Sequence, residues 1–226
     1  MGNGIVFTHD NGKSWTEPHN ISADFGPASG GLPGPGTGLQ LAGGEHDGRL
    51  LVISHHGAYV DDYISYSDDD GITWTTNPSP FPTMDEGALT QLPNGSVLAN
   101  MRHQNSTHIG RGVSISEDGG ATFGPLQFDS TLISPVCQAS IVSFDGATYF
   151  SNPASTTGRD HITIRRSTDN ARTWEASLLV HEGPTFGYSC LVKGEILGTQ
   201  NVGGILYESA NQDIAFSQFE LNFTAQ

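Results

Sequence analysis

One eight-residue pattern occurs four times in this chain and limits its fold more than any other feature. The copies read THDNGKSW (8–15), SDDDGITW (67–74), SEDGGATF (116–123) and STDNARTW (167–174). Their first residues, at positions 8, 67, 116 and 167, are therefore 59, 49 and 51 positions apart. Self-similarity at a period of about 50 residues indicates a repeat architecture.

Short apolar or alternating runs fill the intervals between the copies, and Gly, Pro, Asn or Asp bounds each run, as is typical of strands. The runs are GIVFT, RLLVIS, YISYS, GALTQL, SVLANM, GVSIS, ASIVSF, ATYFSN, HITIRRS, GILYES and IAFSQFEL. The dipeptides Asn94-Gly95 and Asp145-Gly146 predict hairpins. No window keeps a helical period, so the chain is expected to be all-β. About four strands in each repeat of about 50 residues describe the blades of a β-propeller.

The repeated pattern itself predicts a stapled turn rather than chemistry. Its Asp can accept hydrogen bonds from the backbone of its own turn, its Gly permits a positive φ, and its aromatic residue can pack into the blade. Two copies depart from the pattern, because Phe123 replaces Trp and Ala171 replaces Gly. We expect the last turn to be less strained for that reason.

The charge balance restricts the partners of the chain. It has 24 acidic against 9 basic side chains and a net charge of -15, which argues against binding to nucleic acid or to an anionic membrane. A cluster of arginines would be needed to hold an anionic ligand. Cys137 and Cys190, the two cysteines, cannot build a disulfide framework or a cysteine zinc site, and we expect both to be buried. No apolar run approaches the roughly 18 residues of a membrane span.

The repeat resembles the Asp-box, or BNR, repeat of sialidases. Four further segments stand in the order found in that family: GPGTGLQL with GRLLVISHHG, DEGALTQLPNGSVLANMR, YFSNPASTTGRDHITIRRS, and GPTFGYSCL with ILYES. The resemblance runs from Gly4 to the C-terminus and is strongest to the lysosomal branch of animal sialidases. It implies a six-bladed sialidase propeller, of which residues 1–226 would form a single incomplete domain with about four to five blades and without its N-terminal part.

The resemblance assigns Tyr188, in GYSCL, to the catalytic tyrosine and Glu86, in DEGALTQL, to its paired glutamate. The chemistry explains this pair. A sialoside carries a carboxylate on its anomeric carbon, which would repel an anionic nucleophile but not a neutral phenol. A phenol has a pKa of about 10 and needs a base at hydrogen-bond range, the role expected of Glu86.

Arg102 and Arg159 match the second and third arginines of the triad that binds the sialic-acid carboxylate in this family. A planar, permanently charged guanidinium can pair with a carboxylate through two hydrogen bonds. Glu208, in ILYES, matches the acidic residue that orients the first arginine of the triad. We expect the neighbouring Arg165 and Arg166 to have structural or solvent-facing roles.

Two parts of the family's site have no counterpart in this sequence: the RIP-type motif with the first arginine, and the aspartate that acts as acid and base. Asp61 and Asp62 are not assigned to the second role, because their surroundings do not resemble the missing motif. We therefore expect little activity from this chain alone, since the loss of a positioned proton donor costs about 10²- to 10⁴-fold.

Several other residues receive weaker assignments. His55 and His56 follow an apolar strand and are expected to be packed or solvent-facing rather than metal ligands. Asn100 and Asn152 are expected to add polar contacts to the sugar. Residues 34–36 (GPG) are expected to form a loop near the substrate cleft.

The sequence thus predicts an exo-α-sialidase that acts on sialylated glycoproteins, glycolipids or oligosaccharides without a cofactor. Two alternatives remain: a propeller that binds sialosides without turnover, and a noncatalytic Asp-box scaffold that binds proteins. Sequons at Asn20, Asn94, Asn105 and Asn222 favour a lysosomal or secreted location only weakly.

Overall fold

The computed structural model describes residues 2–57, 59–104, 110–194, 201–211 and 213–224. Apart from one short 3-10 helix, η1, the regular elements in these ranges are strands, as the all-β prediction requires. Their bounds are β1 Gly4–Ile5, β2 His19–Asn20, η1 Gly26–Ala28, β3 Leu32–Pro33, β4 Leu39–Gln40, β5 Leu50–His56, β6 Asp61–Ser67, β7 Thr75–Thr76, β8 Phe81–Pro82, β9 Met84–Gln91, β10 Val97–His103, β11 Arg111–Ser116, β12 Gln127–Asp129, β13 Ser140–Phe144, β14 Ala147–Pro153, β15 Ile162–Ser167, β16 Ala176–His181, β17 Thr185–Lys193, β18 Val202–Ser209 and β19 Ile214–Glu220.

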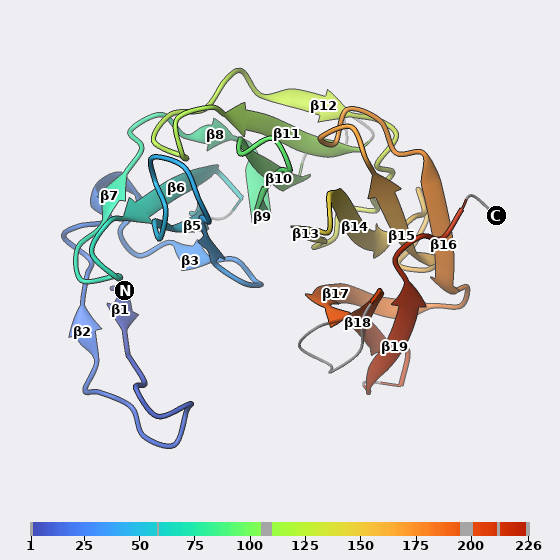
Figure 1. The fold of residues 1–226 in the computed structure, drawn as a ribbon, viewed down its shortest axis with the longest axis horizontal. Coiled ribbons are helices and arrows are strands. Elements are labelled where there is room, and N and C mark those ends of the chain that lie inside the picture. The colour runs from blue at the N-terminus through green and yellow to red at the C-terminus, as the bar shows by residue number, and fades with distance from the viewer. Residues whose placement is uncertain (1, 58, 105–109, 195–200, 212, 225–226) are drawn as a thin grey trace.

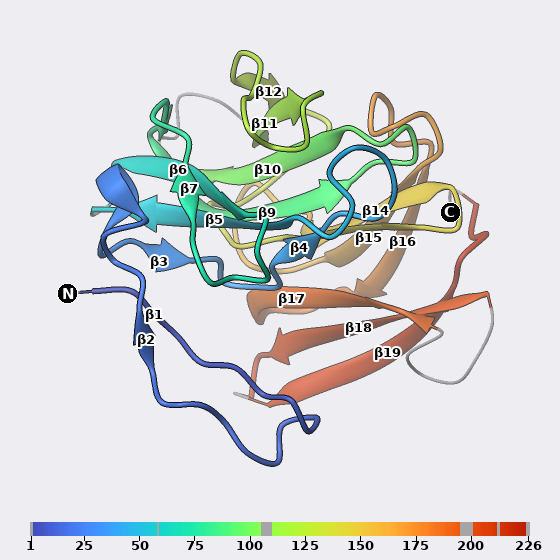
Figure 2. The same ribbon diagram turned by 60° about the vertical axis from the view of Figure 1, so that its left-hand side comes forward.

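The strands form four blades and a separate two-stranded ribbon, β1–β2. The blades are β3-β5-β6-β7 with β4 and β8 at its margins, β9–β12, β13–β16 and β17–β19. Figure 1 shows the blades in an open arc around a common centre, with the ribbon near one end and β17–β19 at the other. Figure 2 shows the ribbon extending away from the blades. The predicted β-propeller is confirmed with four blades in the described residues, whereas the total of six remains a prediction.

The two predicted hairpins form, but with different turns. Asp145 and Gly146 have φ of 52° and 76°, and Phe144 pairs with Ala147, as in a two-residue type I′ turn. At the other hairpin only Gly95 has a positive φ, and its N–H donates to the carbonyl of Leu92. That loop has three residues, because Pro93 cannot take a positive φ.

In three blades an Asp box joins the third strand to the fourth, and the side-chain staple predicted from its sequence is present. In the box at 67–74, the Ser67 hydroxyl donates to the Asp69 carboxylate and accepts the Gly71 N–H. Asp69 also accepts the N–H and the hydroxyl of Thr73, at 2.9 and 2.6 Å. The same four bonds recur at the equivalent positions of the boxes at 8–15, 116–123 and 167–174.

The expectation of a less strained last turn is wrong. Ala171 has a φ of 58°, close to the left-handed conformation that Gly71 adopts at 86°. The hydrogen bonds of the staple hold the backbone of Ala171 in this conformation, because the Ser167 hydroxyl still accepts the Ala171 N–H at 3.0 Å. An alanine in this conformation meets a steric penalty that glycine avoids.

The aromatic residues that end the boxes differ in burial. Trp74 is 8% exposed, packs against Phe25 at 5.8 Å between ring centroids, and donates its indole N–H to the Gly71 carbonyl. Trp15, beside the two-stranded ribbon, is 60% exposed. The apolar cores lie between successive blades. Cys137 is buried and Cys190 is half-buried, and both are free thiols.

Candidate active site

The structure brings Tyr188 and Glu86 into contact although they lie 102 positions apart. The Tyr188 hydroxyl, on β17, donates a hydrogen bond to Glu86 Oε1, on β9. The other oxygen of the same carboxylate, Oε2, lies 2.5 Å from Nη1 of Arg102 on β10. A phenol, a carboxylate and a guanidinium from two blades therefore form one connected group.

Gly187 explains how β17 can carry Tyr188 to this place. Its φ is 98°, and a Cβ there would lie 2.7 Å from the Cys137 Sγ, 3.0 Å from Cδ of Arg159 and 3.1 Å from Cγ of Pro153. The 2.7 Å approach is closer than real Cβ atoms come, and the positive φ also favours glycine, so the position selects glycine. The pairing of β17 with β18 also shifts register between Thr185 and Ser189, next to the tyrosine.

Arg159 and Glu208 also lie beside Tyr188, one near its ring and the other at its backbone. The Arg159 guanidinium donates to the Phe186 carbonyl at 2.9 Å and stands 5.7 Å from the centroid of the Tyr188 ring. Glu208, on β18, accepts the backbone N–H of Tyr188 at 3.1 Å. The five predicted site residues are thus neighbours, although their proposed roles are not tested by this geometry.

The electrostatic surroundings keep the phenol neutral. Burial raises the pKa of Tyr188 above its ordinary value, and the hydrogen bond to the negative Glu86 carboxylate raises it further. Burial lowers the pKa of Arg102, but the hydrogen bond and the charge of Glu86, together with the charge of Asp85, outweigh burial, so this pKa is also raised. The group can therefore present an un-ionised oxygen beside a base and beside a cation that suits an anionic ligand.

A family model described as "BNR repeat-like domain" matches residues 3–198. The chain belongs to this family. It is 35% identical to a sialidase of Micromonospora viridifaciens, covering 96% of this chain and 35% of that protein, and 31% identical to a sialidase of Bacteroides fragilis, covering 94% and 40%. A solved structure named "Hadza microbial sialidase Hz136" superposes with a TM-score of 0.83 at 31% identity, covering 98% of this chain and 44% of that one.

These comparisons confirm the predicted kinship of this BNR-repeat chain with sialidases. They do not test its placement on the lysosomal animal branch. The chain spans about 35 to 40% of the length of the two curated sialidases.

Three charged residues that the sequence reasoning missed or left unassigned support the site of the BNR propeller. Asp85, beside Glu86, is 1% exposed and places Oδ2 3.4 Å from Nε of Arg102. Arg111 is fully buried and donates to Asn100 Oδ1 and to the Cys137 carbonyl. Asp62 is also fully buried, so its side chain cannot reach a substrate. A charged residue inside an apolar strand was the available signal for Arg111.

The weaker assignments have mixed outcomes. Asn152 is fully buried and bonded to Arg165 and to the Ile133 carbonyl, so its expected contact to the sugar is wrong. Asn100 accepts a hydrogen bond from Arg111 through Oδ1, and its expected contact to the sugar stays a prediction. Arg165 has the expected structural role. Arg166 is 3.8 Å from Glu175.

The loop at 34–36 lies near the site, as expected. Pro35 and Gly36 line a shallow hollow of about 300 Å³ together with Tyr188 and Glu208. His55 and His56 are half-buried. Within the described part of the chain, no three His, Cys, Asp or Glu side chains are grouped so that they could hold a metal ion.

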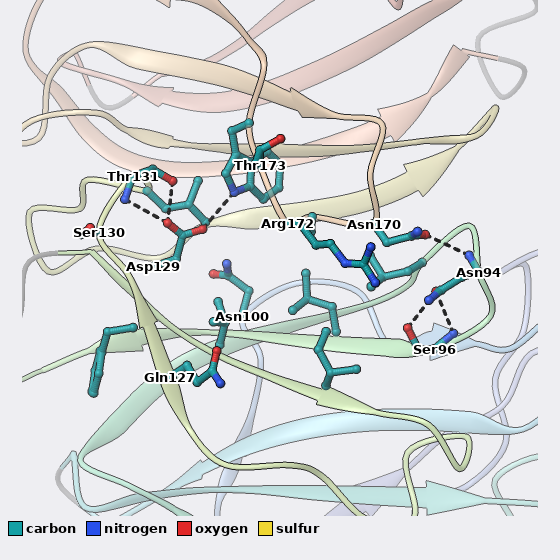
Figure 3. Close-up of a pocket in the computed structure, with 18 of the residues that line it drawn as sticks. Asn94, Ser96, Asn100, Gln127, Asp129, Ser130, Thr131, Asn170, Arg172 and Thr173 are labelled. Atoms are coloured by element: carbon teal, nitrogen blue, oxygen red, sulfur yellow. Dashed lines mark hydrogen bonds between the residues drawn. The ribbon is translucent and has the colours of Figure 1, made fainter.

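A larger cavity, of about 690 Å³, is not at this site. It lies between the hairpin at 92–96, strands β10–β12 and the last Asp box, and Figure 3 shows Asn94 and Asn170 bridging its rim. Asn100 lines it, but Tyr188, Glu86, Arg102 and Arg159 do not. We therefore place the candidate active site by its chemistry and not by cavity size.

Proposed function

We propose that the protein to which this chain belongs is an exo-α-sialidase, which hydrolyses terminal α-linked sialic acid with retention of configuration. The contact of the Tyr188 hydroxyl with Glu86 is the observation that carries the proposal. In the first step Tyr188 Oη attacks the anomeric carbon, Glu86 takes the phenolic proton, and the glycosidic oxygen leaves with a proton from an acid that is not identified in this sequence. Water then gives a proton to the conjugate base of that acid and attacks the anomeric carbon, while Glu86 returns the phenolic proton to the departing Tyr188.

Arg102 and Arg159 would bind the substrate carboxylate, which also directs the anomeric carbon toward the phenol. Both guanidinium groups stand beside Tyr188 or its base, and both are permanently charged. On a chain with a net charge of -15, such a local cluster is what an anionic sugar requires. Glu208 would orient a further arginine from a segment outside this sequence.

The test is hydrolysis of a fluorogenic sialoside by the full-length protein, with the configuration of the first product followed by NMR. We expect retention of configuration, and we expect Tyr188→Phe to abolish the tyrosyl intermediate. Tyr66→Phe is the matched control, because that ring stacks on Arg49 in another blade. Near-parental turnover by Tyr188→Phe would place the nucleophile elsewhere.

A second candidate function for the 226-residue chain alone is sialoside binding without turnover. The chain covers only 35 to 40% of the length of the two curated sialidases, and the proton donor and the first arginine are not identified in its sequence. Both observations favour binding without turnover. Binding of sialyllactose and release of sialic acid should be measured separately. Binding without release supports this candidate, whereas robust release by the purified chain contradicts it.

We also propose a lysosomal or secreted location. Asn20, Asn94 and Asn222 are exposed, as acceptors of glycans must be, whereas Asn105 lies outside the described residues. No helix in the described residues is long and apolar enough to cross a membrane. A mobility shift of the cellular protein after enzymatic removal of N-glycans tests this location, and an unshifted band contradicts it.

A further inference from the structure

Five ionisable side chains form a buried group near the Tyr188 hydroxyl, which we call the buried charge cluster. Its members come from four adjacent strands of two blades: Asp62 on β6, Asp85 and Glu86 on β9, Arg102 on β10 and Arg111 on β11. Each is 9% exposed or less. Charges that are removed from water in this way must balance one another or lose their charge.

Asp62 differs from Asp85, whose oxygens also lack hydrogen bonds, because Asp85 lies in ion-pair range of Arg102 and His55 and Asp62 has no ion pair among the described residues. It is 0% exposed, and neither of its oxygens has a hydrogen-bond partner among the described residues. Its Oδ2 would lie only 3.2 Å from a Cβ on Gly87, so the carboxyl group abuts the backbone next to Glu86. An isolated ionised carboxylate is very costly in such a place, whereas a protonated one is neutral.

The number of acidic and basic groups in the cluster also favours a protonated Asp62. Three carboxyl groups face two guanidinium groups, and Arg102 already serves both Glu86, at 2.5 Å, and Asp85, at 3.4 Å. If all three carboxyl groups were ionised, the cluster would carry one net negative charge beside the place where an anionic sugar must bind. If one is neutral, the charges of these five side chains balance; His55, whose Nδ1 lies 3.8 Å from Asp85 Oδ1, is the titratable neighbour outside this count.

We propose that Asp62 is a positioning residue of the anion site: it keeps its proton, so that the buried charge cluster stays neutral and Arg102 remains able to attract the substrate carboxylate. This role rests on the proposed function. The groups that face Asp62 are Asp85 and Glu86 from β9, Arg111 from β11, His55 across the β5–β6 pairing, and Asp61 on its own strand. Burial, followed by repulsion from Asp85, raises the pKa of Asp62 well above its ordinary value, and Arg111 opposes this rise only in part.

The proton itself can be observed without any activity. Infrared spectra of the 226-residue chain near neutral pH should contain the C=O band of a buried protonated carboxyl group. The band should vanish in Asp62→Asn and remain in Asp61→Asn, the matched control on the same strand. Its absence from the parent chain, or its survival in Asp62→Asn, overturns the proposal.

The positioning role is tested by pH profiles of the full-length protein. Ionisation of Asp62 should weaken binding of the anionic substrate, so Asp62→Asn should move the alkaline limb of kcat/KM upward by about one pH unit or more. The limb of Asp61→Asn should not move upward, because removal of the Asp61 charge can only lower the pKa of Asp62. Calorimetric affinity for N-acetylneuraminic acid should show the same shift, and this measurement does not require turnover.

The outcomes separate this inference from the proposed function. Binding of N-acetylneuraminic acid without hydrolysis, with the pH shift present, would contradict the sialidase proposal and support the role of Asp62. An unmoved limb and an unmoved affinity profile would overturn the role of Asp62 even in an active sialidase. A protein that neither binds nor hydrolyses sialic acid overturns both.

Discussion

Asp69 and Asp62 lie seven positions apart in one blade, yet the structure treats their carboxyl groups in opposite ways. Asp69, in an Asp box, accepts hydrogen bonds from Ser67 and from both the N–H and the hydroxyl of Thr73. The bonds from Thr73 are the main reason that the pKa of Asp69 is lowered. Asp62 is fully buried without such partners, and burial raises its pKa.

The difference teaches where the supporting groups come from. The partners of Asp69 lie within four residues of it, so the sequence of the box alone determines the environment of its carboxylate. The environment of Asp62 is made mainly by Asp85 and Glu86 on β9 and Arg111 on β11, which are distant in the sequence. One carboxylate belongs to the scaffold, and the other belongs to a site assembled by the packing of blades.

The largest expected effect comes from changing the site itself. Glu86→Gln keeps the shape of the side chain but removes the base for Tyr188, so turnover of the full-length protein should fall by about 10²- to 10⁴-fold. Hydrolysis of a fluorogenic sialoside measures this loss. Glu117→Gln, at an exposed position in an Asp box, is the control. A Glu86→Gln variant with parental turnover would show that Glu86 is not the base for Tyr188.

Within the scaffold, the Trp residues of two boxes should differ strongly. Trp74→Ala should lower the free energy of unfolding by about 3–5 kcal/mol, because Trp74 is 8% exposed and packs on Phe25. Trp15→Ala should change it by about 0.5 kcal/mol or less, because Trp15 is 60% exposed. Denaturant unfolding of the two variants tests this. Equal losses would show that the ribbon is covered in solution.

The two aspartates should respond to pH with opposite signs. The pKa of Asp69 is lowered on folding, so its charge stabilises the fold above the unfolded pKa, and this stability is lost as the pH falls. The pKa of Asp62 is raised, so the folded state holds the extra proton and stability falls as the pH rises above the unfolded value of about 3.9.

Near neutral pH, Asp69→Asn should therefore lower the melting temperature and Asp62→Asn should raise it. The Asp62→Asn difference should shrink as the pH falls toward 4, whereas the Asp69→Asn difference should persist to about pH 4 and shrink only below it, as the pH falls toward the lowered pKa of Asp69. Thermal unfolding followed by circular dichroism from about pH 2 to 8 measures both differences. A loss of stability in Asp62→Asn at neutral pH would contradict the protonated state.

The smallest expected effect concerns the last box. Ala171→Gly should stabilise the chain by about 0.5–1 kcal/mol, because glycine relieves the left-handed strain but gains freedom in the unfolded state. Gly71→Ala should destabilise it by about 1–2 kcal/mol, since the same conformation would then be imposed on alanine. Denaturant midpoints measure both changes. A destabilised Ala171→Gly variant would mean that the alanine side chain contributes packing that outweighs its strain.

The features that could be predicted from the sequence are those formed by residues close together in the chain. The strands, the hairpins and the staples depend on residues a few positions apart, and their sequence patterns located them. The role of Asp62 depends on burial across blades, for which a single sequence has no local signal. For Arg111 the available signal was a charged residue within a strand. The resemblance to sialidases located Tyr188 and Glu86, but it gave no sign that Asp85 lies within ion-pair range of Arg102. Ala171 was misjudged because the staple of its box holds the backbone whichever residue stands there.

The order of strands in the blades has a consequence for how the chain folds. In β9–β12 and β13–β16 each strand pairs with the one that follows it in the chain, so each blade closes over a short segment. Short loops cost little entropy to close, and sheets built from them nucleate faster than sheets that join distant segments. A blade can therefore form soon after its last strand leaves the ribosome, before the next blade is synthesised. Tyr188 and Glu86, which belong to different blades, would meet only in a late step of assembly.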